Sequence, residues 1–255
     1  MARISQFALL HGAAQASWVW EETLAALAQQ MHGREYRAEA FDLPGCGRRR
    51  GEDVSNLSVR EVAEAFAADL AASGMTDVIL VGHSNAGTIL PRVALRLPHL
   101  IRHIVYVSCL APAPGQSVRQ LVSAGPSAGI DDSADRTGDR TLVPSRKHLQ
   151  RIFCNDMSEE EATRFLSKLG RDMSPTLRSM DEQDWRYDHL QKVSGTYVVC
   201  LRDQTLPPDW QEQFALRFLV QRIVHVHAGH QVINTRPHTL AEILRHEAIS
   251  IGATG

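Results

Sequence analysis

Short apolar runs and longer amphipathic stretches alternate along most of the chain. The apolar runs are rich in β-branched residues and predict buried strands at 6–11, 36–41, 78–82, 103–108, 195–201 and 222–226. Between them, apolar positions spaced three and four residues apart predict helices at 18–31, from 58 onward, after 87, at 208–218 and at 237–251. Strands that alternate with helices of this length pair in parallel through right-handed crossovers. The sequence therefore predicts an α/β fold with a mostly parallel, doubly wound sheet.

The alternation stops after residue 111 and resumes near residue 191. In between lie a tract rich in Gly, Pro, Ser and Asp (113–140) and then helical segments, one of which begins at the capping box Ser158–Glu161. An insertion of this length within an α/β sheet predicts a mainly helical cap (112–190) over one sheet end. The core would then consist of 1–111 and 191–255. A peripheral decoration is the alternative interpretation.

Composition narrows the classes of function. A chain of 255 residues with 44% hydrophobic residues can build one large domain, or a domain with a lid. Its formal net charge of -2 argues against a general binder of nucleic acid or membrane surfaces. The four cysteines are far apart and form no Cys-x-x-Cys pair, which favours neither a zinc site nor a disulfide framework.

The N-terminal sequence and the lengths of the apolar runs indicate where in the cell the protein is expected. The N-terminus has no basic segment followed by an apolar core, so no signal peptide is predicted. No apolar stretch approaches the roughly 18 residues that a membrane span needs. We therefore expect a cytoplasmic protein that acts on a small molecule. A homodimer is the commonest assembly of such proteins.

One strand-to-helix connection carries a serine at its apex. The run from Val78 ends in Gly82-His-Ser-Asn-Ala-Gly87, and a helical pattern follows at once. Such a turn strains the central residue and lifts the Ser84 hydroxyl above the sheet edge. It also needs small residues at Gly82 and Ala86, where strand and helix approach closely. An ordinary turn, in which Gly and Ser are common, is the plainer interpretation.

Other strand ends supply partners for this serine. Asp203 follows one later strand, and His230 follows the last one. In open parallel sheets, ligands bind beyond the carboxyl ends of the strands. A serine hydroxyl needs a base to remove its proton, and that imidazole needs a carboxylate on its other nitrogen. Ser84, Asp203 and His230 are thus the predicted catalytic triad, in the chain order that this turn requires.

The same arrangement predicts an oxyanion hole. The backbone N–H of Asn85, directly after the nucleophile, is one candidate donor. The N–H of Ala13, in the loop after the first strand, is the other. Each donor of this kind typically contributes about 3–4 kcal/mol of transition-state stabilisation.

Each assignment has a competing explanation. Because the chain has twelve histidines, one near a strand end is weak evidence on its own. His83, His225 and His227 are expected to be structural. Asp209 is the alternative acid, although it looks like the first turn of the next helix.

With these motifs, the chain resembles an α/β-hydrolase of the branch that contains plant methylesterases, hydroxynitrile lyases and their bacterial relatives. The resemblance covers nearly the whole length. It rests on His11-Gly-Ala with Trp18-Val-Trp20, Asp42-Leu-Pro-Gly45, Gly82-His-Ser84, Phe153-Cys-Asn-Asp156, Cys200-Leu-Arg-Asp203 followed by Leu206-Pro207, and Ala228-Gly-His230. The resemblance implies the same triad, the same oxyanion donors, an inserted cap, and neither a metal nor an organic cofactor.

Some positions depart from that branch. Its hydroxynitrile lyases carry a threonine at the place of Gly12 and a lysine after the catalytic histidine, where this chain has Gln231. The lyase needs the charge of that lysine to stabilise departing cyanide, so its absence favours ester hydrolysis. The plant esterases usually have a histidine at Gln15, and the turn usually has a glycine at Ala86.

Three functions are compatible with this pattern. The favoured one is a serine hydrolase that cleaves a small carboxylic ester, such as an aryl or alkyl ester, a lactone or a carbamate, through an acyl-enzyme. The second is a non-hydrolytic enzyme on the same site, either a carbon–carbon lyase or a cofactor-free oxygenase. The third is a small-molecule receptor with a vestigial site. Trp185, Tyr187, Phe153, Met157 and Leu121 are plausible pocket walls or simply core of the cap.

Overall fold

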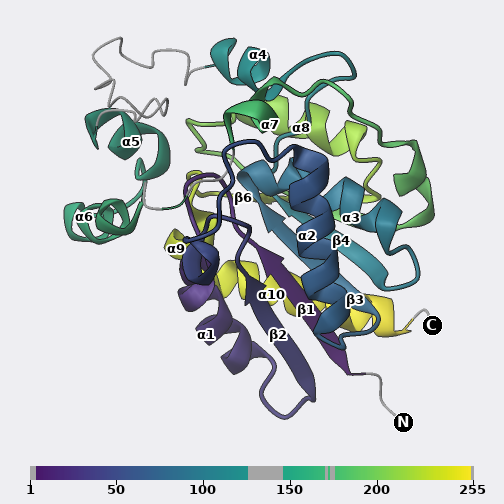
Figure 1. The fold of residues 1–255 in the computed structure, drawn as a ribbon. Helices are drawn as coiled ribbons and strands as arrows, with labels where there is room; N and C mark the ends of the chain where they lie inside the picture. Colours follow the sequence, from purple (N-terminus) through teal and green to yellow (C-terminus); the bar gives the residue numbers. More distant parts are fainter. Residues whose placement is uncertain (1–3, 126–145, 170–171, 173–175, 254–255) are drawn as a thin grey trace.

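A six-stranded parallel sheet forms the centre of the molecule (Figure 1). The computed structural model describes residues 4–125, 146–169, 172 and 176–253. The strands are β1 (Ser5–Leu10), β2 (Tyr36–Phe41), β3 (Val78–His83), β4 (Ile101–Val107), β5 (Ser194–Cys200) and β6 (Arg222–Val226). Their spatial order is β2-β1-β3-β4-β5-β6. The predicted parallel, doubly wound sheet is confirmed.

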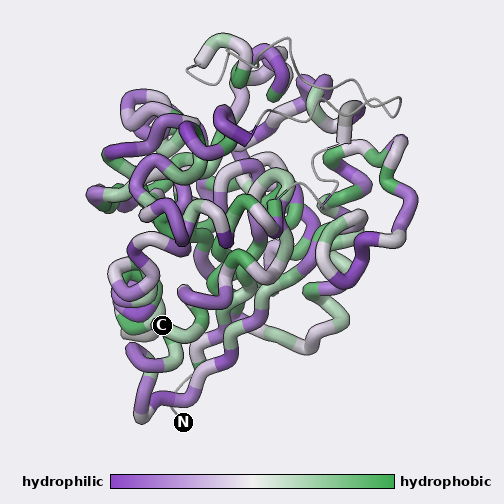
Figure 2. Tube along the Cα trace, turned by 90° about the vertical axis from the view of Figure 1, so that its left-hand side faces the viewer, coloured by the Kyte–Doolittle hydropathy of each residue, from purple (hydrophilic) through white to green (hydrophobic). Residues whose placement is uncertain are grey.

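Helices cover both faces of this sheet, because alternate strand residues point to opposite sides. In β1, Phe7 and Leu9 join the apolar cluster under α1 (Glu21–Gln30) and α10 (Pro237–Ala253). Ala8 and Leu10 join the cluster on the other face. That cluster includes residues of α2 (Val59–Ala72), α3 (Leu90–Arg96) and α8 (Pro208–Arg217). Figure 2 shows this apolar interior as green tube, with the hydrophilic segments on the outside.

Two helices begin later than the sequence pattern predicts. The single helix expected at 18–31 is divided into a 3-10 turn, η1 (Ser17–Trp20), and α1, which begins at two glutamates that favour a helix N-terminus. After the serine turn, the chain first forms a second 3-10 segment, η3 (Ser84–Thr88), before α3 begins at Leu90. Pro91 in the first turn of α3 suits that start, because its missing N–H has no helical partner there.

Between β4 and β5 the chain leaves the sheet for several helices. These are α4 (Val118–Ser123), α5 (Arg146–Phe153), α6 (Glu159–Lys168), α7 (Leu177–Asp181) and η5 (Asp188–Lys192). The predicted capping box at Ser158 is present at the start of α6. Figure 1 shows α4, α5 and α7 at the upper end of the molecule, away from both chain termini. Residues 126–140 of the Gly/Pro/Ser/Asp-rich tract lie outside the described residues.

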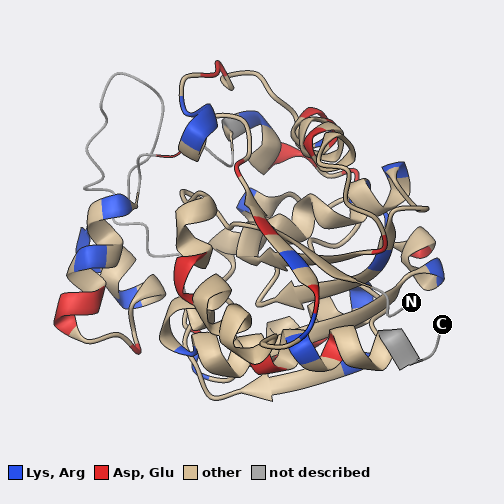
Figure 3. Ribbon diagram, turned by 90° about the horizontal axis from the view of Figure 1, so that it is seen from below, with Lys and Arg blue, Asp and Glu red and all other residues tan. Residues whose placement is uncertain are grey.

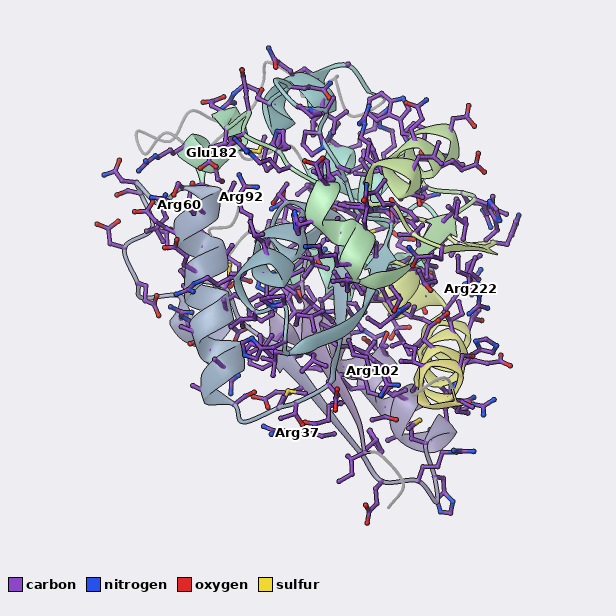
Figure 4. All side chains as sticks on the ribbon, turned by 90° about the vertical axis from the view of Figure 1, so that its right-hand side faces the viewer. Arg37, Arg60, Arg92, Arg102, Glu182 and Arg222 are labelled. Atoms are coloured by element: carbon purple, nitrogen blue, oxygen red, sulfur yellow. The ribbon has the colours of Figure 1, made fainter. Side chains whose placement is uncertain are left out.

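Two acidic side chains, the buried Asp172 and the partly buried Glu182, connect this segment between β4 and β5 to the sheet core. The Asp172 carboxylate accepts hydrogen bonds from the Gly47 N–H (2.8 Å) and the Arg50 guanidinium (2.8 Å). Glu182 accepts from the Val59 N–H at the start of α2 (2.6 Å) and lies 3.5 Å from Arg92 on α3. Figure 4 shows Arg92 and Glu182 side by side near that end of α2.

Charged side chains lie mainly on the surface of the molecule (Figure 3), whereas the cysteines lie in its interior. Lys, Arg, Asp and Glu lie mainly around the outside in Figure 3, and most of the central strands are free of them. All four cysteines are buried, and none of them forms a disulfide; burial raises the pKa of the Cys154 thiol to about 12. In the described part of the chain, none of the helices has both the length and the apolar character to cross a membrane.

Candidate active site

Ser84 lies at the sharp turn between β3 and η3, in a conformation that most side chains avoid. Its φ is 54°, in the left-handed region. The neighbouring small residues make the turn possible. A β-carbon at Gly82 would lie 2.5 Å from Leu90 Cδ1 and 2.9 Å from Ala86 Cβ. The predicted strained serine and the close approach at Gly82 and Ala86 are therefore both present.

The loops after β5 and β6 bring an acid and a base to this serine. His230 Nδ1 is 2.7 Å from Asp203 Oδ2, and His230 Nε2 is 2.9 Å from Ser84 Oγ. All three side chains are buried, with exposed fractions of 7% for Ser84, 5% for Asp203 and 0% for His230. The three predicted residues thus form a continuous hydrogen-bonded chain.

The partners of His230 fix the tautomer of its ring. Asp203 Oδ2 is the acceptor beside Nδ1, so that nitrogen carries the proton and donates it. In the neutral imidazole, Nε2 then has a free lone pair and accepts from the Ser84 hydroxyl. In this arrangement the imidazole can remove the serine proton.

Asp203 is held by donors from four other residues. Its Oδ1 accepts from the N–H groups of Thr205 (2.7 Å) and Leu206 (2.9 Å). Its Oδ2 accepts from the Ser108 hydroxyl (2.5 Å) and, more weakly, from Gln211 Nε2 (3.2 Å). Sequence reasoning missed both side-chain donors. Ser108 ends the predicted fourth strand and could have been found by its position, whereas nothing in the sequence pattern singles out Gln211.

Two further buried histidines lie beneath the site. His83 Nε2 donates to the backbone carbonyl of His230 (2.9 Å), and the two rings are 4.8 Å apart. Burial, aided by the neighbouring His230, holds the pKa of His83 well below its usual value. His11 Nε2 accepts from the Leu43 N–H (3.2 Å), and burial lowers the pKa of this histidine too. His83 thus binds the backbone carbonyl of His230, a contact that agrees with the structural role expected for it.

The loop after β1 packs directly against the serine. A β-carbon at Gly12 would lie 2.9 Å from Ser84 Cβ and 3.1 Å from His83 Nδ1, so no larger residue fits without movement. Ala13 follows in the same loop and is partly buried. Asn85 is buried in the first turn of η3, next to Ser84. Gly12 and Ser84 therefore pack against each other, and the two predicted oxyanion residues, Ala13 and Asn85, each directly follow one of them in the sequence.

The competing residues lie elsewhere. Asp209 is exposed in the first turn of α8. His225 is half-exposed and pairs with Glu212 at 3.1 Å, and His227 is exposed. Within the described ranges, no group of three or more His, Cys, Asp or Glu side chains could hold a metal ion.

The five residues between β4 and β5 that the sequence offered as pocket walls lie in different surroundings. The Phe153 ring lies 5.4 Å from the His230 ring. Trp185 and Tyr187 are buried in the apolar cluster on the α2, α3 and α8 face of the sheet, where their polar atoms donate to backbone carbonyls of Gln116 and Pro112. Leu121 belongs to the same cluster. Met157 lines a separate cavity of about 210 Å³ beside Trp18 and Phe165, which does not reach Ser84.

Comparison with known proteins assigns the family. The sequence profile described as "Alpha/beta hydrolase family" matches residues 7–243, which is most of the chain. The chain belongs to the alpha/beta hydrolase family. Within it, the similar proteins include plant methylesterases and bacterial esterases, in agreement with the branch that the sequence motifs indicate.

Two relatives show how far this likeness extends. A carbendazim-hydrolysing esterase of a Nocardioides strain is 31% identical over 47% of this alpha/beta hydrolase and 48% of its own length. A chloroplastic methylesterase of Arabidopsis thaliana is 22% identical over 94% of the chain and 63% of its own length. The chain thus spans about half the length of the Nocardioides esterase and somewhat under two thirds of the length of the Arabidopsis methylesterase.

A solved structure shows the same fold. An extracellular alpha/beta hydrolase of a Paenibacillus species superposes with a TM-score of 0.81 at 21% identity, over 96% of this chain and 98% of the other. It is described as sharing structural and functional homology with tobacco salicylic acid binding protein 2. At this identity the match establishes the fold of the present hydrolase.

Proposed function

We propose that this alpha/beta hydrolase cleaves a small carboxylic ester through an acyl-enzyme on Ser84. The observation that carries the proposal is the unbroken hydrogen-bonded chain from Asp203 through His230 to the strained Ser84. The names of its relatives, esterases and methylesterases, support the same reaction class.

The proposed reaction begins with proton removal. His230 Nε2 takes the Ser84 proton while Oγ attacks the ester carbonyl carbon, forming a tetrahedral intermediate. Asp203 stabilises the imidazolium that results. The same proton then passes from Nε2 to the departing alkoxide or phenoxide, which leaves as the alcohol. A water molecule, deprotonated by His230, cleaves the acyl-enzyme by the reverse sequence and releases the acid.

The negative oxygen of the intermediate needs donors that are already in place. We assign this role to the backbone N–H groups of Ala13 and Asn85. The tight contact between Gly12 and Ser84 supports the assignment, because it holds the Ala13 loop against the nucleophile.

The segment 112–190 is the proposed cap of the site. The contact of Phe153 with His230 supports this role, as do the ties that Asp172 and Glu182 make to the core.

Two buried positions favour hydrolysis over cyanide-releasing lyase chemistry. Gln231 is fully buried beside the catalytic histidine and supplies a neutral amide where that reaction needs a cation. The Gly12 position has no room for a threonine side chain in this arrangement. Other lyase or oxygenase reactions and slow turnover by a receptor would use the same triad, so the products must be identified.

The test is a panel of short-chain aryl and alkyl esters, lactones and carbamates, with carbendazim included, assayed with wild type and Ser84→Ala. We expect release of acid and alcohol by the wild type and loss of that activity in the variant. Equal rates in the two proteins would overturn the proposal. Tight capture of a ligand without turnover would assign the receptor role instead, and products other than acid and alcohol would assign lyase or oxygenase chemistry.

A further inference from the structure

The end of α5 and the turn after it contact both loops that carry the partners of Ser84. We call residues 152–156 the bridging segment. It lies far from both loops in sequence, and it belongs to the excursion between β4 and β5 rather than to the sheet core. Its contacts with each loop are made by specific hydrogen bonds rather than by apolar packing alone.

The bridging segment holds the acid loop on both sides of Asp203. Asn155 Nδ2 donates to the backbone carbonyl of Arg202 at 2.7 Å, one residue before the acid. Two residues after the acid, the Thr205 hydroxyl donates to the backbone carbonyl of Ile152 at 2.8 Å. The N–H of Thr205 in turn donates to Asp203 itself.

The same segment holds the histidine loop on both sides of His230. Asp156 Oδ2 accepts from the Gly229 N–H at 2.7 Å, one residue before the histidine. It also accepts from the Thr235 hydroxyl at 3.0 Å, five residues after it. One carboxylate oxygen therefore closes the turn that carries His230.

The contact at Gly229 explains why a glycine precedes the histidine. Its φ lies outside the left-handed region, so backbone conformation does not require glycine there. A β-carbon at this position, however, would lie 2.4 Å from Asn155 Oδ1 and 2.5 Å from Asp156 Oδ1. Both oxygens are buried and lack a hydrogen-bond partner within the described structure. The loop and the bridging segment are thus packed as closely as a glycine allows.

We propose that Asn155 and Asp156 are positioning residues that set the Asp203–His230–Ser84 geometry from outside the sheet core. The proposal rests on the triad function proposed above. Neither residue touches the reacting atoms. Each fixes the backbone next to a triad residue, and Asp156 has the larger role because it spans the whole histidine turn. A misplacement of about 1 Å in such a group can cost roughly 100-fold in rate.

The test compares variants by their rate per titrated site on a chromogenic aryl ester. A fluorophosphonate counts the competent serines, so unfolded protein does not enter the rate. We expect Asp156→Ala to lose roughly 100-fold in kcat per site, and Asn155→Ala and Thr235→Val roughly tenfold. Asp156→Asn keeps an oxygen acceptor and should remain within about tenfold of wild type. Glu159→Gln, an exposed acid on α6, is the matched control and should match wild type.

A double variant separates positioning from general loosening. Because Asp156 and Thr235 act through one contact, Asp156→Ala with Thr235→Val should be no slower than Asp156→Ala alone. Rates per site equal to wild type in Asp156→Ala, or losses that multiply in the double variant, would overturn the proposal. If Asp156→Ala does not fold, Thr235→Val and Asn155→Ala decide, and rates per site equal to wild type in both would overturn the proposal.

A readout without substrate keeps this proposal distinct from the proposed function. The proton on His230 Nδ1 should give a low-field NMR resonance in the wild type, in Glu159→Gln and in Asp156→Asn. We expect it to shift or broaden in Asp156→Ala. An unchanged resonance in that variant would contradict the positioning role even if the wild type hydrolysed no ester, and a shift would support it regardless of the reaction.

Discussion

Ser84 lies on a turn whose shape is set by small residues around it, whereas Asp203 and His230 lie on loops whose shape is set by hydrogen bonds from elsewhere. On the serine side, Gly12 and Gly82 leave no space for a β-carbon. On the other side, the Asp203 carboxylate depends on the Ser108 hydroxyl. The first kind of control depends on residues with no side chain to clash, Gly82 in the strand before the turn and Gly12 in the neighbouring loop after β1. The second is assembled from distant parts of the chain, and each of its contacts can be removed singly.

The largest effect is expected on the hydrogen-bonded side, at Asp203→Asn. The amide can present an N–H to His230 Nδ1, which favours the wrong tautomer and leaves Nε2 unable to accept the serine proton. We expect kcat to fall about 10⁴-fold with little change in folding. Steady-state kinetics and a circular dichroism spectrum check this prediction. A loss below tenfold would mean that another group orients the imidazole.

Gly82→Val tests the packed side. Its side chain would have to displace Leu90 and Ala86, so we expect the free energy of unfolding to fall by about 1–3 kcal/mol. Urea unfolding measures the change. Gly51→Ala is the control, because a β-carbon there meets nothing within 4 Å. If both variants were equally stable, the close approach of strand and helix would not shape the turn.

These two sides also explain what could be predicted from the sequence. The strands could be predicted from the apolar runs. The triad Ser84, Asp203 and His230 and the small residues of the serine turn could be predicted from their positions at the strand ends. Ser108 could have been placed near the site by its position at the end of the predicted fourth strand, but its bond to Asp203 and the whole role of Gln211 could not be predicted, because the intervening residues carry no signal of these contacts. The 3-10 segment η3 was missed because an apolar pattern does not distinguish it from the start of α3.

A smaller effect is expected for Ser108→Ala. Asp203 would keep its two backbone donors and Gln211 but lose its shortest hydrogen bond. A hydrogen bond to a charged group contributes about 1.5–3 kcal/mol, so we expect kcat to fall roughly tenfold or somewhat more. Ser167→Ala, on the exposed face of α6, should leave kcat unchanged. Equal kcat values for the two variants would show that the two backbone donors and Gln211 are enough to hold the acid.

The smallest effect at neutral pH is expected for His83→Gln. Burial holds the pKa of the folded His83 well below its usual value, so below about pH 6.5 the unfolded chain binds a proton there that the folded protein does not. The free energy of unfolding therefore falls as the pH falls through this range, by at most about 1.4 kcal/mol per pH unit for one group. Urea unfolding between pH 7.5 and 4.5 should show a shallower fall in the variant. Parallel curves would contradict a neutral, buried His83.

The most direct measurement is the location of a covalent adduct. The protein is treated with a fluorophosphonate and digested, and the labelled peptide is sequenced by mass spectrometry. The account predicts a single adduct on Ser84, formed much more slowly in His230→Ala. An adduct on another serine, or ester hydrolysis by a protein that forms no adduct, would contradict Ser84 as the nucleophile.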